Sequence, residues 1–317
     1  MTTRRRWGAA ACNIAISLLS VFAAAAMLGA QAQTADSDMP AEIFAARPLE
    51  VLSWKVLFQR YGVVVTYEEP VWQWRGYVYI RGNDENAPHA QWLKQRRFIL
   101  PEWFTPEQTP KLDAAALGRL LEAYHAQNPD GARFKVLESR LRLHIVPVQA
   151  HNAAGELAPA FSLLEARIRV PVGRRMASEH FKALCAAITA VTGTKVQAGG
   201  QWLDQAYAAN GWVPPRGAAE VLPEQDKERY RFEWGVDWMP AREALLRFID
   251  QSATTLQWAL MCHPSGRPAD RFCVLNLTAL VTKQVQPDGK TVEKAVYFDR
   301  RPEPKKGPSL PMPEELR

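Results

Sequence analysis

The chain has 317 residues, of which 47% are hydrophobic and 23% are charged, and its formal net charge is +6 at pH 7. This composition is too apolar for an intrinsically disordered protein and too charged for a protein with many membrane spans. The length leaves room for about two domains, because a single hydrophobic core stops growing near about 250–300 residues.

The first 32 residues have the three parts of a secretory signal peptide. Arg4, Arg5 and Arg6 precede an uncharged run that ends at Ala30. Ala30-Gln31-Ala32 then supplies the small-x-small pattern that a signal peptidase accepts. We therefore expect a signal peptide over residues 1–32 and a periplasmic or secreted protein. An uncleaved signal would instead anchor the chain, because about 20 apolar residues span a bilayer.

Removal of this segment takes away three of the positive charges. The remaining chain has 36 basic and 33 acidic side chains, a net charge of +3. Nucleic-acid binding needs a clustered basic face, whereas the basic and acidic residues here are interleaved. We expect no nucleic-acid partner, and membrane contact only through the N-terminal signal if it is uncleaved.

The organisation of the chain predicts two modules. After a linker over residues 33–46, the segment 47–150 contains a helix that ends at Gly62, a β-branched strand, a second helix capped by Asp113, and a hairpin. The hairpin's other face, opposite its apolar residues, is expected to carry Arg133, Lys135, Arg142 and His144. In the polar loop over residues 83–110, three aromatic residues are predicted to anchor onto the core: Trp92, Phe98 and Trp103.

Residues 161–285 follow a similar order of helix, glycine, strand, second helix and hairpin. The sequence therefore predicts an α+β fold of two repeated small modules, each with two helices packed on short mixed or antiparallel sheets and joined by long loops. A disordered tail rich in Pro and Lys is expected over residues 300–317.

The second module resembles the short N-terminal domain of secretins and TonB-dependent receptors, over residues of about 163–196 and 230–280. The matching positions are apolar residues of a strand–helix–strand pattern: Ile168, Val170, Phe181, Leu184, Ile188, Gly193 and Val196, then Phe232, Leu245, Phe248, Ile249, Leu256 and Trp258. The second stretch departs from the family by having Ser252-Ala253-Thr254 where a glycine is usual. The resemblance implies an envelope interaction module and brings no catalytic residues.

Two cysteines flank a short loop between apolar alternating runs. Cys262 and Cys273 face each other if the runs form a hairpin, and an oxidising compartment then allows a disulfide; the alternative is two reduced thiols. A metal site with His263 and Asp270 is disfavoured, because adjacent strand residues point to opposite faces. Cys185 is predicted to be a buried apolar residue.

The sequence contains none of the usual catalytic motifs, and it predicts no cofactor and no metal site. The carboxylates of Glu68 and Glu69 follow a strand, and paired carboxylates serve glycoside hydrolysis. Neighbouring strand positions point apart, however, so the simpler interpretation is a solvated turn.

The aromatic residues are the most distinctive feature of the sequence. Trp72, Trp74, Tyr77 and Tyr79 lie close together, so they can line one face of an extended segment and bind a ligand by stacking. The alternative is that they seal a core under the loop that follows.

These observations lead to one hypothesis and two alternatives. The first is a non-enzymatic exported (periplasmic) protein that binds an unknown envelope protein or glycan. The second is a cell-wall glycan binder or hydrolase that uses the Trp72–Tyr79 aromatic strand. The third is an accessory subunit of a secretion or pilus system.

Overall fold

The computed structural model describes residues 40–80, 91–105, 107–139, 141–199, 203–204, 228–252, 254–264, 271–285 and 291–295. Contacts divide the chain into two units, Met1–Met39 and Pro40–Arg317, and all described residues belong to the second. The expected signal peptide and tail lie outside the described residues. The linker prediction for residues 33–46 was wrong at its end, because Glu42–Ala45 forms a strand that pairs with residues 96–99.

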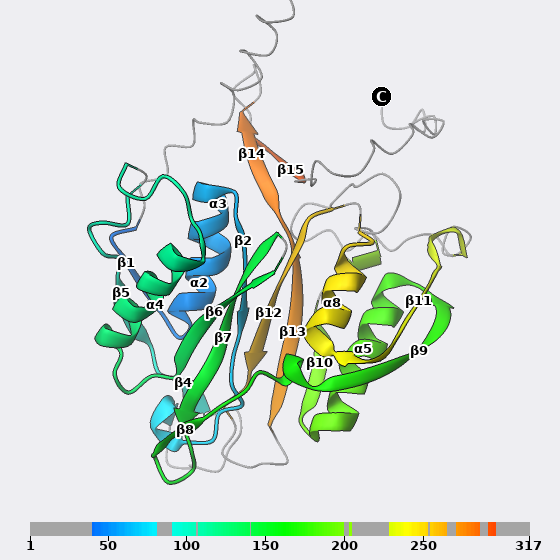
Figure 1. Ribbon diagram of the computed structural model, residues 1–317, viewed down its shortest axis with the longest axis horizontal. Helices are drawn as coiled ribbons and strands as arrows, with labels where there is room; N and C mark the ends of the chain where they lie inside the picture. Colours follow the sequence, from blue (N-terminus) through cyan, green and yellow to red (C-terminus); the bar gives the residue numbers. More distant parts are fainter. Residues whose placement is uncertain are drawn as a thin grey trace, which may run out of the picture. The chain divides into compact units, whose positions relative to one another are not determined.

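The first half of the described chain runs from residue 40 to residue 160 (Figure 1). Its elements in chain order are β1 (Glu42–Ala45), α2 (Pro48–Val51), the π-helix η1 (Leu52–Leu57), α3 (Phe58–Tyr61), β2 (Val64–Glu68), the 3-10 helix η2 (Arg75–Tyr77), β3 (Val78–Ile80), β4 (Gln91–Leu93), β5 (Arg96–Ile99), α4 (Ala114–Gln127), β6 (Arg133–Ser139), β7 (Arg142–His151) and β8 (Leu157–Pro159).

The second half continues to residue 295. Its elements are η4 (Leu163–Glu165), β9 (Arg167–Arg175), α5 (Ala177–Thr192), β10 (Lys195–Gly199), η5 (Glu228–Tyr230), β11 (Phe232–Pro240), α8 (Ala241–Ile249), β12 (Leu256–Cys262), β13 (Phe272–Ala279), β14 (Val281–Val285) and β15 (Thr291–Ala295).

Local signals in the sequence set several helix ends. Pro48 lies in the first turn of α2, where its missing N–H costs nothing. Asp113 accepts a hydrogen bond of 2.8 Å from the backbone N–H of Ala116 and so caps α4. Gly62 and Gly193 follow α3 and α5 with φ values of 64° and 69°, a conformation that glycine adopts without strain.

A seven-stranded sheet connects the two halves. Its order is β10-β13-β12-β2-β7-β6, and β8 pairs with β7 beside this path. The hairpins β6–β7 and β12–β13 are antiparallel, whereas β2 pairs in parallel with β7 and β10 with β13. The halves meet where β12 pairs in parallel with β2. Described residues also form four two-stranded sheets, β1–β5, β3–β4, β9–β11 and β14–β15. The fold is therefore α+β, as predicted.

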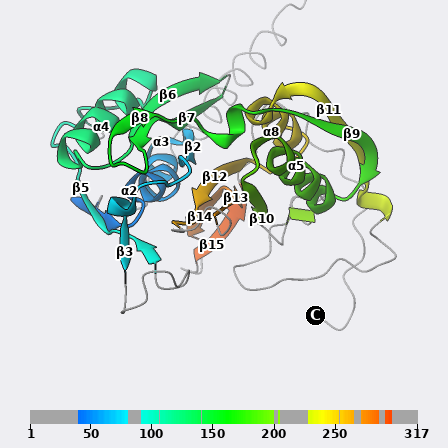
Figure 2. The same cartoon turned by 90° about the horizontal axis from the view of Figure 1, so that it is seen from below.

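The helices of the two halves lie on opposite faces of this sheet (Figure 2). Side chains alternate along a strand, so Tyr67 and Glu68 leave β2 in opposite directions. Tyr67 packs near Phe134 of β6, and Glu68 reaches Arg242 in α8 of the second half. Each face of β2 is thus covered, and all five residues of this strand are buried.

Large apolar side chains fill the space between helices and sheet in each half. The fully buried ones include Leu52, Leu57, Phe98, Phe104, Leu117 and Leu120 in the first half and Phe181, Phe248 and Trp258 in the second. Burying each such side chain contributes about 1.5–3 kcal/mol. Phe98 is an anchor, as predicted, but Trp92 is exposed. Arg142 and His144 were predicted on the face opposite the apolar residues of the hairpin, but both are buried, because Arg142 pairs with Asp250 and His144 stacks on Trp258 of the second half.

Candidate functional site

The end of β2, where the two halves meet, carries two adjacent carboxylates. Glu68 pairs with Leu260 of β12 in register, and the backbone N–H of Glu69 donates to the carbonyl of Leu260 at 3.0 Å. Both glutamates have an exposed fraction of 0%. The prediction of a solvated turn was therefore wrong, because the second half of the chain covers this turn.

Glu68 forms an ion pair across the junction. Arg242, near the start of α8, donates from Nε and Nη2 to the two carboxylate oxygens at 2.9 Å and 2.7 Å. The indole N–H of Trp258 donates to the same carboxylate at 3.3 Å. Burial alone lowers the pKa of Arg242, but the hydrogen bonds and charge of Glu68 outweigh it and raise that pKa above its ordinary value. Such a two-point pair fixes the angle between the groups.

Glu69 forms hydrogen bonds with an arginine of its own half and with a backbone N–H group of the other half. Arg47 Nε donates to Glu69 Oε1 at 2.8 Å, and the backbone N–H of Cys262 donates to Oε2 at 2.6 Å. Arg47 Nη2 also donates to the carbonyl of Cys262 at 3.0 Å. Burial raises the pKa of Glu69 above its ordinary value, against the lowering effect of the Arg47 charge. A buried carboxylate with a raised pKa is a candidate acid, but both oxygens here already have partners.

Strand β12, which Glu69 and Arg47 contact at Cys262, also carries one cysteine of the predicted disulfide. Cys262 and Cys273 are cross-strand partners in the β12–β13 hairpin, with an S–S distance of 2.07 Å. Such a pair is consistent with an oxidising environment. Asp270 of the disfavoured metal site lies outside the described residues, and the ring of His263 stacks on Phe272 at 4.9 Å. Cys185 is buried, as predicted.

A histidine on the same face of β2 and β7 is the nearest approach to a catalytic pair. His144 Nε2 lies 2.8 Å from Ser139 Oγ, Nδ1 lies 2.8 Å from Thr66 Oγ1, and the ring stacks on Trp258. Burial lowers the pKa of His144 to about 4. An imidazole with so low a pKa is a poor general base near neutral pH, so this group holds Ser139 and Thr66 in place.

The four predicted aromatic residues do not share one strand. Trp72 and Trp74 precede the 3-10 helix η2, Tyr77 ends it, and Tyr79 lies in β3. Trp72 and Tyr77 are buried and meet edge to face at 4.7 Å, and Trp74 packs on His151 at 4.5 Å. The expected row of stacking side chains is therefore a packed cluster, because η2 turns the chain between them.

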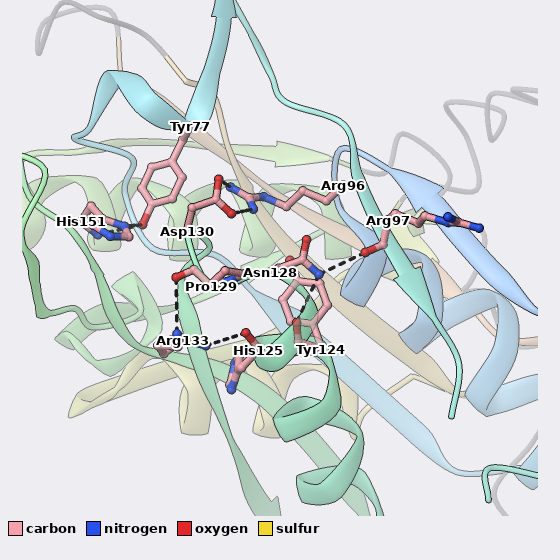
Figure 3. A network of polar contacts seen from close by, with 10 residues as sticks. All are labelled: Tyr77, Arg96, Arg97, Tyr124, His125, Asn128, Pro129, Asp130, Arg133 and His151. Atoms are coloured by element: carbon pink, nitrogen blue, oxygen red, sulfur yellow. Dashed lines mark hydrogen bonds and ion pairs between the residues drawn. The ribbon is translucent and has the colours of Figure 1, made fainter. Parts of the chain in front are cut away.

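Polar contacts fix this cluster to the rest of the first half (Figure 3). Tyr77 Oη lies 2.8 Å from His151 Nδ1 and accepts from the backbone N–H of His151 at 2.7 Å. In the turn after α4, Asp130 accepts from Arg96 of β5 at 2.7 Å. The Asn128 side chain donates to the carbonyl of Arg97 at 3.1 Å. These contacts join Tyr77 to β7, and they join the turn after α4 to β5.

Tyr79, in β3, has a cross-strand neighbour outside the predicted group of four aromatic residues. It pairs across the β3–β4 ladder with Trp92, and the two side chains are 60% and 58% exposed. Directly opposed residues of a ladder lie close enough for their side chains to interact. We call Tyr79 and Trp92 the aromatic pair. Gln91-Trp92-Leu93 has no polar–apolar alternation, so no local signal marked Trp92 as the outward residue of this strand.

The described part of the chain contains no group of three or more His, Cys, Asp or Glu side chains placed to hold a metal ion. Among the described helices, none combines the length and apolarity needed to cross a bilayer. The chain matches no protein-family model, no curated protein and no solved structure.

Proposed function

We propose that the chain is an exported envelope protein without enzymatic activity, that it works by binding another envelope component, and that its two halves are copies of one α+β module. The support comes from topology, from the partners of the buried charged groups and from the exposed aromatic pair.

The observation that carries the proposal is the common strand order of the halves. In the first half, β2 pairs in parallel with β7, the second strand of the β6–β7 hairpin. In the second half, β10 pairs in parallel with β13, the second strand of the β12–β13 hairpin. Each half adds a two-stranded sheet, β1–β5 or β9–β11, whose strands precede the two helices. Both first helices end at a glycine two residues before the next strand.

This common order extends the family resemblance. The strand–helix–strand pattern on which the resemblance rests corresponds to β9, α5 and β10. The first half has β1, then α2 to α3, then β2 in the same order, although its sequence was not part of the resemblance. Two modules of an envelope interaction type favour a binding role.

The junction chemistry also favours binding over catalysis. Glu68, Glu69 and His144 are buried, and each is held by hydrogen bonds to partners within the chain. A catalytic acid or base must reach a substrate. These buried groups are better explained as residues that stabilise the contact between the two modules. The exposed aromatic pair can instead contribute large contact area to a partner.

A second candidate is glycan binding at the aromatic pair. Aromatic faces can stack on the apolar faces of sugar rings, and Tyr79 and Trp92 are the exposed members of the aromatic region. In this candidate the glycan contacts Tyr79 and Trp92 in place of the four residues of the expected Trp72–Tyr79 strand.

The test has an arm for each partner. The full chain with its own leader is expressed in a bacterium with an envelope and fractionated, with a photo-crosslinking amino acid at Tyr79 or Trp92. Lys182, exposed on α5, is the matched control position. We expect the protein outside the cytoplasm and a discrete crosslinked envelope protein from the aromatic pair but not from Lys182.

Sedimentation with insoluble peptidoglycan separates the two candidates. Retention that is lost in the Tyr79→Ala, Trp92→Ala double variant supports the glycan candidate instead of a protein partner. A cytoplasmic location, or release of soluble fragments from the peptidoglycan, contradicts the proposal of a non-enzymatic exported protein.

A further inference from the structure

The two edges of the seven-stranded sheet carry strands that correspond to the two strands of the internal junction. The halves meet between β12 and β2 in the order β10-β13-β12-β2-β7-β6. By the common strand order, β10 of the second half corresponds to β2 of the first, and β6 of the first half corresponds to β12 of the second. Among the described residues, β10 and β6 each have a single neighbouring strand in this sheet.

The correspondence between the halves holds residue by residue. Each half has a row of three residues paired across its strands: Tyr67, Ile145 and Val136 in the first half and Ala198, Leu275 and Leu260 in the second. Both first strands begin two residues after the glycine that ends the preceding helix, Gly62 or Gly193. Ala198 is therefore the counterpart of Tyr67, and Lys135 is the counterpart of Ala259.

A half-turn about an axis along the sheet, across the strands, relates the two halves. β2 is parallel to β12, β12 is antiparallel to β13, and β13 is parallel to β10, so β10 runs in the opposite direction to its counterpart β2. The helices of the halves also lie on opposite faces of the sheet (Figure 2). A half-turn combined with a shift of three strands produces both reversals and keeps the strand order. This operation does not close on itself, so its repetition adds further units in a row.

We propose that the β6 edge of one copy of the chain pairs in parallel with the β10 edge of a second copy, so that the contact repeats the internal β12–β2 junction. This inference rests on the proposed duplication of the module. In the internal junction Ala259 lies opposite Tyr67. The same register between copies places Lys135 opposite Ala198 of the second copy. Edge strands present unpaired backbone groups, and strand addition uses these groups.

The position that corresponds to Arg242 of the junction is a glycine. Each half has two buried aromatic residues ten positions apart, one in the helix before the hairpin and one in the first strand of the hairpin: Tyr124 and Phe134, and Phe248 and Trp258. Arg242 lies six residues before Phe248, and Gly118 lies six residues before Tyr124. Gly118 of α4 is thus the counterpart of Arg242 of α8.

The contact between copies lacks the ion pair of the internal junction. Glu68 binds Arg242 there, whereas their counterparts at the sheet edges are Gly199 and Gly118. Lys135 also places a charge on the β6 edge, and charged side chains weaken pairing between edges. The contact between copies therefore depends on backbone pairing, and we expect it to be weaker than the internal junction and reversible on dilution.

The first experiment tests the register by cross-linking the full chain with an oxidant, copper phenanthroline. The double variant Lys135→Cys, Ala198→Cys places one thiol on each edge. We expect a ladder of cross-linked oligomers on a non-reducing gel, because each copy then links to a neighbour at both edges. The matched control is Lys182→Cys, Ala198→Cys, since Lys182 is exposed on α5 and lies on neither edge. The control should give no ladder.

The second experiment introduces the missing ion pair at the contact. Gly118→Arg with Gly199→Glu supplies the counterparts of Arg242 and Glu68. No atom lies within 4 Å of a Cβ added at Gly118, and the nearest atom to a Cβ added at Gly199 is Oδ1 of the Asn276 side chain, at 2.8 Å. We expect the double variant to associate about tenfold more tightly than the wild type in sedimentation velocity, because close charge pairs at interfaces can strengthen binding.

A variant with like charges is the matched control for this ion pair. Gly118→Glu with Gly199→Glu makes substitutions at the same two positions, so it has the same added side chain at Gly199. Because two carboxylates repel each other, it should associate no more tightly than the wild type.

Three results overturn the proposal. The first is a double-cysteine variant that gives no more oligomer than its control. The second is a cross-linked dimer from Lys135→Cys alone or Ala198→Cys alone, which would show that like edges meet. The third is equal association of the variants with opposite and with like charges.

Failure of this inference and failure of the proposed function give different results. Absence of the ladder leaves the location of the protein and the partner of the aromatic pair unaffected, because that pair lies on β3–β4 and not on the edges. A cytoplasmic location contradicts the proposed function, whereas a ladder from the double-cysteine variant would still support pairing between copies.

Discussion

At the scale of single residues, two neighbouring glutamates, Glu68 and Glu69, connect the halves through different partners. Glu68 reaches Arg242 across the sheet, and Glu69 reaches Arg47 and the backbone of Cys262. Each carboxylate lies in a buried setting where loss of one partner leaves the other charge without compensation. Such a loss is much more costly than loss of an exposed pair.

We predict that Glu68→Gln lowers the free energy of unfolding by about 3 kcal/mol, because it leaves the largely buried Arg242 with an uncompensated charge. Chemical denaturation of the full chain measures this loss. Glu243→Gln is the matched control, since Glu243 pairs with Arg247 between exposed side chains. It should cost less than about 1 kcal/mol. If the two substitutions lowered the free energy of unfolding equally, the Glu68–Arg242 pair would not stabilise the junction more than an exposed pair does.

One buried histidine, His144, and one half-buried histidine, His125, predict that stability decreases in acid. Burial lowers the pKa of both His144 and His125 to about 4, below the ordinary 6.5 that applies when the chain is unfolded. The unfolded chain therefore binds more protons between these values. Their contribution is complete above about pH 6.5 and is lost as the pH falls towards 4.

The variant His144→Asn should remove one of these contributions. We predict that the wild type loses roughly 2 kcal/mol more than the variant when the pH is lowered from about 7 to about 5. Denaturation curves at both pH values measure the difference. The prediction fails if both proteins lose the same free energy.

At the scale of elements, the β12–β13 hairpin joins a disulfide to the junction. Cys262 bonds to Cys273 through its side chain, and its backbone N–H and carbonyl bind Glu69 and Arg47. The β12–β13 hairpin is thus both cross-linked by the disulfide and hydrogen-bonded to Glu69 and Arg47 of the first half. Loosening the hairpin is expected to weaken the junction as well.

We predict that reduction of this disulfide lowers the free energy of unfolding by about 2–3 kcal/mol, as expected for closure of a short loop. Thermal unfolding with and without reductant measures the effect in the wild type and in Cys262→Ser, Cys273→Ser. The double variant should not respond to reductant. Labelling under denaturing conditions of protein cleaved after residue 32 should find one free thiol, that of Cys185, and three labelled thiols would contradict the bond.

At the scale of the whole second unit, one sheet runs through both halves. The β2–β12 pairing makes it continuous, and the Glu68–Arg242 pair and the Cys262 contacts cross the same boundary. Because the two halves share one sheet and are linked by buried ion pairs, unfolding of one half removes stabilising contacts from the other. The halves should therefore unfold as one cooperative unit.

Calorimetry of the full chain tests this expectation. A single transition with equal calorimetric and van't Hoff enthalpies is predicted, and Glu68→Gln should lower its midpoint. Two separated transitions would show that each half is stable without the other.

Local sequence determined the elements but not how they meet. Glycine and aspartate caps, helical spacing around Leu120 and Phe181, and alternation in Ile168 and Val170 predicted helices and strands, because these signals act within a few residues. The turn between Cys262 and Cys273 similarly predicted a hairpin that brings the thiols together. Each of these inferences depends on contacts between near neighbours in the chain.

Only the tertiary structure decided the environment of the polar and aromatic residues. Glu68 meets an arginine 174 residues later, and the ring of His144 stacks on Trp258, a residue of the other half. Trp92 and its cross-strand partner Tyr79 are exposed, whereas Trp72 is buried. Burial and ion pairing depend on long-range packing, and no local pattern records which distant face will cover a side chain. The sequence alone thus determined an α+β chain with a hairpin between Cys262 and Cys273, and long-range packing decided which of its charged and aromatic groups remain available to a partner.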